Sequence, residues 1–487
     1  MQRMCAQTVT SNDIARLSGW RRWRSQLLAL VPGNNATGAD TADADNADAA
    51  AGDHHGSAGL GALLSFAIRI GSALITFIAQ ILMARWLGAH DYGVYTYVWV
   101  VINVVGTLAT VGLSMSAVRF LNEYLEQQQP ALARGFLRFS RIISLAVASL
   151  AMLGGIALLQ LHPGVVEEAY HTPLMIGLLA LPAFALTDFH DGTGRARGWL
   201  MLALLPPYIL RPLLLLLVLG LGILLLGERD ATIAATALVI ATWVSALIQF
   251  VLQQRRFRAE LGSTPPRMQA REWLKVSLPL LLLDSFTLLM MNLDVLLLKL
   301  FVAPQELAIY FAAARIIAFV AFVHFAVTAV AMPRFASAYA QNDIGKAGRL
   351  LRQFRLWTFV PSLAAAGFFL LIGPFVLGLF GPEFPAAMPV MAVLAAGHLA
   401  RALAGPAEAM LSVSGRQMYI AVITGITALL NIALNLALIP RHGMLGAAYA
   451  TAGAYLFQSA ILWMASNRLA REGYGECKGQ ERAADEA

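Results

Sequence analysis

Apolar runs long enough to cross a lipid bilayer recur along the whole chain, and no other feature limits the fold as strongly. Most of these runs hold 18 or more mostly apolar residues, as in LLPPYILRPLLLLLVLGLGILLL (204–226). About 20 such residues cross a hydrocarbon core of roughly 30 Å as a helix. The runs are continuous rather than alternating, which argues against a membrane barrel. Of the 487 residues, 58% are hydrophobic and only 13% are charged. The sequence therefore predicts an all-α integral membrane protein.

The runs predict about twelve membrane-spanning helices. Their expected ranges are 60–83, 94–118, 140–160, 173–189, 201–226, 231–253, 274–298, 307–331, 356–380, 386–404, 417–439 and 444–466. If the N-terminus is cytoplasmic, 26 of the 35 Arg and Lys residues lie in cytoplasmic segments, and only Arg85, Arg229, Lys299 and Arg441 lie outside. Such a bias sets topology in membrane proteins. We therefore expect both termini in the cytoplasm, and the net charge of +7 indicates topology rather than nucleic-acid binding.

The chain contains a weak internal repeat. SAVRFLNEYLEQQQPALARGF (116–136) matches AMPRFASAYAQNDIGKAGRLL (331–351) at an offset of 215 residues. The same offset superposes the first three expected spans on the seventh to ninth. Because each half then holds six spans, the halves share one orientation and are related by a pseudo-two-fold axis along the membrane normal. Two six-helix lobes with a cleft between them are typical of an alternating-access carrier.

These patterns divide the chain into five segments. Residues 1–57 form a cytoplasmic tail, which is basic and amphipathic at 16–33 and acidic with expected disorder at 33–57. The N-terminal lobe covers 58–254, a cytoplasmic linker 255–272, the C-terminal lobe 273–466 and a second cytoplasmic tail 467–487. The two cysteines, Cys5 and Cys477, lie in the tails, so no disulfide framework is expected.

Arg69, Arg211 and Arg315 fall inside expected spans, where a charge facing lipid costs roughly 2.5–3.5 kcal/mol. They should face a cleft or other protein groups. Proline at 206, 207 and 212 predicts a kink around Arg211. An arginine suits a phosphate because its fork donates two parallel hydrogen bonds. The functional interpretation is a substrate-binding site for an anion; a structural ion pair or a guanidinium bonded to backbone carbonyls is the alternative.

Two further sets of polar residues occur in the expected C-terminal lobe. Asp294 and Arg315 have similar depths on adjacent spans, so a structural salt bridge between them competes with a ligand role for Arg315. Asp284, Asn431, Asn435 and Thr451 offer a carboxylate, two amides and a hydroxyl, which suit a hard cation or a proton. Interhelical hydrogen bonding is the alternative for this second set.

Other motifs favour no chemistry. DFHDGTGRARG (188–198) is interpreted as a cytoplasmic turn. We expect no catalytic residue, no resident metal and no enzyme activity. A membrane-embedded glycan polymerase or ligase, which needs a large external loop or an acid/base cluster, is the less favoured alternative.

Several stretches resemble the polysaccharide exporters and lipid-linked oligosaccharide flippases (Wzx-like) of the MOP superfamily. They are ARWLGAHDYGVYTYVWVV (84–101), LRPLLLLL (210–217), LDVLLLKLFVAPQELAIYFAAARI (293–316) and LNLALIPRHGMLGAAYATA (434–452). The resemblance covers about 60–466 and runs in order through both halves. It implies a MATE-like fold.

The resemblance also implies a function. A Wzx-like protein moves an undecaprenyl-diphosphate-linked oligosaccharide from the cytoplasmic to the periplasmic leaflet of the bacterial inner membrane, for surface polysaccharide such as lipopolysaccharide. Related lipid II flippases carry a sodium site between helices 7, 11 and 12, where Asp284, Asn431, Asn435 and Thr451 are expected to lie. Na⁺ or H⁺ is then the coupling ion, with no other cofactor. Membrane lipids, a glycan polymerase or glycosyltransferases are the expected partners, and a MATE-type exporter of small amphipathic compounds is the main alternative.

Overall fold

The computed structural model describes residues 44–341 and 343–485, and the side-chain surroundings of residues 71–282, 284–341 and 343–470. The chain divides into two units, residues 1–63 and 64–487. Residues 1–43 of the expected tail and residues 486–487 lie outside the described part. Helix α2 begins at Ala44, inside the segment for which we expected disorder.

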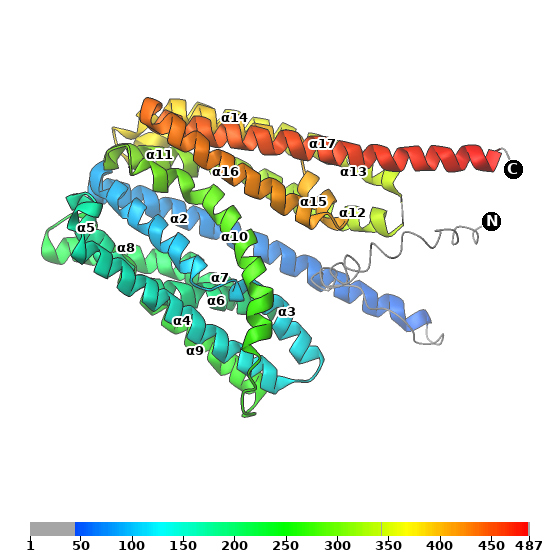
Figure 1. Ribbon diagram of the computed structural model, residues 1–487, viewed down its shortest axis with the longest axis horizontal. Helices are drawn as coiled ribbons and strands as arrows, with labels where there is room; N and C mark the ends of the chain where they lie inside the picture. The colour runs from blue at the N-terminus through cyan, green and yellow to red at the C-terminus, as the bar shows by residue number, and fades with distance from the viewer. Residues whose placement is uncertain (1–43, 342, 486–487) are drawn as a thin grey trace. The chain divides into compact units, whose positions relative to one another are not determined.

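The second unit is built from helices throughout its described length (Figure 1). Those of the N-terminal lobe are α2 (Ala44–Leu108), α3 (Leu113–Glu126), α4 (Pro130–Leu161), η1 (Pro163–Val165), α5 (Glu168–Leu178), α6 (Leu181–Ala196), α7 (Leu200–Leu205), η2 (Pro206–Leu210), α8 (Arg211–Leu226) and α9 (Ala231–Leu261). Those of the C-terminal lobe are α10 (Ala270–Leu298), α11 (Pro304–Ile317), η3 (Ala318–Val320), α12 (Ala321–Ala340), α13 (Ile344–Phe380), η4 (Phe384–Ala387), α14 (Met388–Ala404), α15 (Ala407–Val413), α16 (Gln417–His442) and α17 (Met444–Asp485).

Each of the twelve expected spans is mostly helical, although 94–118 crosses the break between α2 and α3 and 173–189 crosses the break between α5 and α6. In the described residues, nine helices are long and apolar enough to cross a membrane, or ten if the bent pair α5–α6 counts as one span. The number is lower than twelve partly because the first two expected spans merge into one helical stretch, Gly71–Glu126. Helix α9 continues to Leu261 and α10 begins at Ala270, so helical residues occupy both ends of the expected linker, 255–272.

The helices break where the sequence demands it. Gly88 turns α2 with φ 80° and ψ 169°, a conformation that is strained for residues with a Cβ. The offset of 215 pairs Gly88 with Ala303, where the chain passes from α10 to α11. The expected kink before Arg211 is a π-helical turn at Pro206–Leu210, next to the prolines that remove helical hydrogen bonds.

Helix α10 contacts both lobes. Near its start, the Ser277 hydroxyl lies 2.7 Å from that of Ser116 on α3. Further along, Phe286 packs with Ala428 of α16 and Ala454 of α17. Side chains on α10 therefore face partners from either half of the molecule.

The lobes also meet at one end of the bundle, through α2. The Arg85 guanidinium donates two hydrogen bonds of 2.6 Å to the carbonyls of Gly378 and Leu379, in the last turn of α13. Nearby, Gly93 touches the backbone of Pro304 so closely that a Cβ at position 93 would lie 1.9 Å from the Pro304 carbonyl oxygen. This end is closed by direct backbone contact.

Candidate functional site

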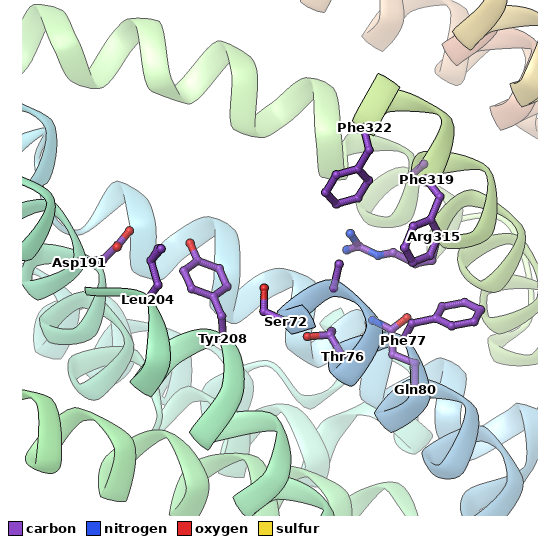
Figure 2. Close-up of a pocket in the computed structure, with 12 residues that line it drawn as sticks. Ser72, Thr76, Phe77, Gln80, Asp191, Leu204, Tyr208, Arg315, Phe319 and Phe322 are labelled. Carbon is purple, nitrogen blue, oxygen red and sulfur yellow. The ribbon is translucent and has the colours of Figure 1, made fainter. Parts of the chain in front are cut away.

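A cavity of about 330 Å³ lies between the lobes. Helix α2 supplies one wall, α6 to η2 a second, and α11 to α12 a third (Figure 2). Its lining residues are Ser72, Ala73, Thr76, Phe77, Gln80, Asp191, Leu204, Tyr208, Arg315, Ala318, Phe319 and Phe322. The lining thus combines hydroxyl and amide groups, phenyl rings and one side chain of each charge.

Arg315 supplies the positive charge of the cavity. It lies on α11, and its guanidinium carbon is 4.6 Å from the centroid of the Phe311 ring. Figure 2 shows its side chain extending into the space between α2 and the phenyl rings of Phe319 and Phe322. A half-buried guanidinium beside aromatic rings can bind an anion while the rings contact apolar or sugar parts of the same molecule.

The expected pair of Asp294 and Arg315 does not form. Among the ion pairs of the described side chains, none joins these two residues. Asp294 instead accepts hydrogen bonds from the hydroxyls of Tyr310, at 2.5 Å, and Thr451, at 2.8 Å. The guanidinium of Arg315 is therefore not paired with Asp294 and lines the cavity.

Arg211 lies away from the cavity lining. Its guanidinium carbon is 4.8 Å from the Trp99 ring centroid and 5.2 Å from that of Phe184. Tyr208, three residues earlier, reaches the cavity instead. Packing between two rings suits a structural cation–π role. Arg69 lies in α2, and its side chain is outside the described part of the chain.

Asp191 supplies the negative charge of the cavity, from α6. It is buried and forms an ion pair of 2.9 Å with Arg195, one helical turn later. Asp191 was not among the expected site residues, because we interpreted 188–198 as a turn. The interpretation was wrong, since α6 continues to Ala196. The N-terminal lobe therefore contributes an acidic group to the cavity, and Arg211, one of its two expected arginines, is not among the lining residues.

Three of the four expected coupling-ion residues come together, but around a different carboxylate. Asn431 donates to Thr451 at 3.4 Å, and Asn435 donates to the side-chain oxygen of Asn431 at 3.1 Å. Thr451 in turn donates to Asp294. Asp284 is not among the residues that form hydrogen bonds in this cluster.

The depth of each residue could have shown this in advance. Asp294 lies near the end of α10, Asn435 near the end of α16, and Thr451 near the start of α17. Consecutive spans run in opposite directions, so these positions share one depth. Asp284 lies ten residues earlier on α10, about 15 Å away along the helix axis.

The Asp294 cluster retains unused acceptors. Within the described residues, one carboxylate oxygen of Asp294 (Oδ1) and the amide oxygen of Asn435 (Oδ1) are buried without a hydrogen-bond partner. Buried acceptors rarely stay unpaired, and carboxylate, amide and hydroxyl oxygens suit hard cations. No group of three or more His, Cys, Asp or Glu side chains that could hold a metal occurs in the described part.

Comparison with known families decides the identity of the chain. The family described as "Polysaccharide biosynthesis protein" matches residues 59–339, more than half of the sequence. The chain belongs to this family. The MatE family also matches, over residues 279–437. No curated protein matches the chain.

Solved structures agree with the family on the fold. One is an inward-facing multidrug resistance MATE family transporter of the MOP superfamily, with a TM-score of 0.69 at 15% identity over 84% of this chain and 99% of that one. The outward-facing form of such a transporter gives 0.59 at 16% identity, over 84% and 96%. A MOP superfamily transporter from Pyrococcus furiosus, described as having a binding pocket of reverse polarity, also gives 0.59 at 16%, over 84% and 95%.

This member of the polysaccharide biosynthesis family therefore has the MATE-like fold, and its described helices form the two lobes given above. In its described part, at least nine helices are long and apolar enough to cross a membrane, and the solved structures that share its fold are transporters of the MOP superfamily. The fold prediction and the recognised superfamily are confirmed.

Proposed function

We propose that the transporter moves an undecaprenyl-diphosphate-linked oligosaccharide from the cytoplasmic to the periplasmic leaflet of a bacterial inner membrane. Arg315 is the observation that carries the proposal. A permanently charged guanidinium opens into the cavity beside Phe319 and Phe322. The diphosphate is the part of the cargo that cannot cross lipid unaided, and the arginine offers it a paired hydrogen-bonding partner. The polyprenyl tail can remain in the bilayer.

The membrane potential favours this direction. With the cytoplasm negative, outward movement of an uncompensated anion gains about 2.3 kcal/mol per charge per 100 mV. The lobe contact at Arg85 closes one end of the bundle. If both termini are cytoplasmic, that closed end is periplasmic, and the cavity is reached from the side where the cargo is made.

A cation at the Asp294 cluster would supply the coupling. Asp294, Asn431, Asn435 and Thr451 would hold Na⁺ or H⁺ through their oxygens, and the two unpaired acceptors support this assignment. An ion that binds one lobe arrangement more tightly shifts the population toward it. Glycosyltransferases or a glycan polymerase would supply and consume the cargo.

The test follows the glycolipid in the two leaflets after deletion of the gene. We expect it to accumulate in the cytoplasmic leaflet, and we expect Arg315→Gln to fail to restore its movement. Arg229→Gln, a matched control at an exposed arginine between α8 and α9, should restore it fully. Unchanged leaflet distribution with normal surface glycan in the deletion strain would refute the proposal.

Asp191 favours a second candidate, a MATE-type exporter of cationic amphipathic compounds. An acidic side chain in the cavity suits a cation. Reversing the charge at Arg315 distinguishes the two candidate functions. Under the flippase proposal, Arg315→Glu abolishes glycolipid movement. An exporter of cationic dyes would keep its activity in Arg315→Glu and lose it in Asp191→Asn.

A further inference from the structure

Two exposed arginines on neighbouring helices of the N-terminal lobe have no negative partner. Arg138 lies near the start of α4, and Arg258 lies in the last turn of α9. No ion pair among the described side chains includes either residue. Helix α4 carries no acidic residue, and Glu260, at the end of α9, pairs with Arg197. Neither arginine lines the cavity between the lobes, so the proposed transport does not use them.

Hydrogen bonds on both sides of these arginines fix how α4 and α9 lie against each other. On one side, Nη1 of Arg141 donates to the side-chain oxygen of Gln254 at 2.5 Å. On the other side, Nη1 of Arg134 donates to the carbonyl oxygen of Gly262 at 2.9 Å. The two helices therefore run side by side in opposite directions over this stretch (Figure 1).

Arg138 and Arg258 lie between these two contacts and at the same level. Arg138 is three or four residues from the two contact arginines of α4, and Arg258 is four residues from each contact residue of α9. Residues at this spacing share a face of a helix, so both arginines lie on the side where the two helices meet. Two like charges at one level repel each other, and an anion between them would remove the repulsion.

The surface that continues from the arginines along both helices is apolar and exposed. Ile142, one turn further along α4, is 53% exposed, and Val251, two turns back along α9, is 37% exposed. Residues 142–161 of α4 and 231–253 of α9 carry no charge. An anion at the arginines therefore has a surface suited to hydrocarbon chains directly beside it.

We propose that Arg138 and Arg258 bind the headgroup of an anionic phospholipid, whose acyl chains lie along the exposed faces of α4 and α9. Arginine donates paired hydrogen bonds to phosphate, and both side chains are exposed enough to reach one phosphate group. Basic residues at the boundary of a membrane span attract anionic lipids. The bound lipid would join α4 to α9 at the level where the two positive charges face each other.

A lipid that binds the folded state raises its stability. The full-length protein in detergent should show a saturable rise in Tm with added phosphatidylglycerol, and a much smaller rise with phosphatidylcholine, whose choline offsets the phosphate charge. Arg138→Gln and Arg258→Gln should each raise the half-saturating concentration about fivefold. Arg352→Gln, at an exposed arginine on α13, should leave this concentration unchanged. It is a matched control, because the repeat pairs α13 with α4.

Native mass spectrometry gives a second measurement that does not depend on Tm. The native protein should retain phosphatidylglycerol, and the double variant Arg138→Gln/Arg258→Gln should retain less than Arg352→Gln. Equal retention in these two variants would overturn the proposal.

Two further ligands test the identity of the anion. Glycerol 1-phosphate, which has the phosphate without acyl chains, should give no rise in Tm at the same concentrations; an equal rise would show a site for a free anion and overturn the proposal. Undecaprenyl diphosphate should not displace phosphatidylglycerol at far lower concentrations. Such displacement would assign the site to the cargo and would also overturn the proposal.

Discussion

Replacing Arg85 should open the closed end of the bundle. The side chain donates two hydrogen bonds from α2 to the last carbonyls of α13, so it holds the lobes together directly. It also places a positive charge at a helix C-terminus, which the helix dipole favours. Arg85→Met removes both effects and keeps most of the apolar stem.

The size of the effect follows from exposure. A hydrogen bond from a charged group contributes about 1.5–3 kcal/mol when buried, and an exposed group contributes far less. Arg85 is exposed, so we assign about 1–2 kcal/mol to the two bonds together. At about 1.4 kcal/mol per factor of ten, the ratio of open to closed molecules should rise about 5- to 30-fold.

Spin labels can measure this ratio. Val165 and Glu383 are exposed, at the closed end of the N-terminal and C-terminal lobes respectively. Both become cysteines in a background where Cys5 and Cys477 are serines. Pulsed dipolar distances should show a larger long-distance population in Arg85→Met than in the native background. Arg229→Met, a matched exposed arginine, should change nothing. Identical distance distributions for Arg85→Met and Arg229→Met would show that Arg85 does not stabilise the closed contact between the lobes.

Three more predictions concern the two lobes and their sites. Gly93→Ala should hinder closure of the lobes, because the new Cβ would lie 1.9 Å from the Pro304 carbonyl oxygen. The spin labels at positions 165 and 383 should then report a longer mean distance. An unchanged distance would contradict the close contact between Gly93 and Pro304. Arg211→Gln should lose two ring contacts worth about 0.5–2 kcal/mol of folding free energy, so its Tm should fall and transport should decrease only in proportion to the amount of folded protein. Arg315→Gln should abolish transport without a change in Tm. The opposite pattern would place the cargo site at Arg211. Asp294→Asn should abolish the dependence of transport on the coupling ion in proteoliposomes, and a retained ion gradient response would remove the cluster from the mechanism.

The helices could be predicted because the length of each apolar run is enough to indicate a membrane-spanning helix. A continuous run of about 20 apolar residues is expected to cross a membrane as a helix, and the expected spans are helical apart from the breaks inside 94–118 and 173–189. The repeat offset added the symmetry, and it even paired Gly88 with the break at Ala303. The π-helical turn before Arg211 followed from prolines, whose effect on a helix is local.

The lateral direction of each side chain was not predictable in the same way. Counting residues gives depth, but a helix that is apolar on every face carries no pattern to show which side meets lipid, a neighbour or the cavity. Arg211 and Arg315 therefore looked alike in sequence. Only the packing of the helices places Arg211 beside aromatic rings and Arg315 in the cavity. The closeness of Asn431 and Asn435 could be predicted, because residues four apart share a face of a helix.

The two charges of the cavity belong to different lobes, Asp191 to the first and Arg315 to the second. Any rocking of the lobes must therefore change the distance between them. A molecule that contacts both side chains fits at one opening angle alone, so the distance between the two charges selects cargo by its length. Because both groups are charged, an empty carrier would still move charge whenever the lobes rock.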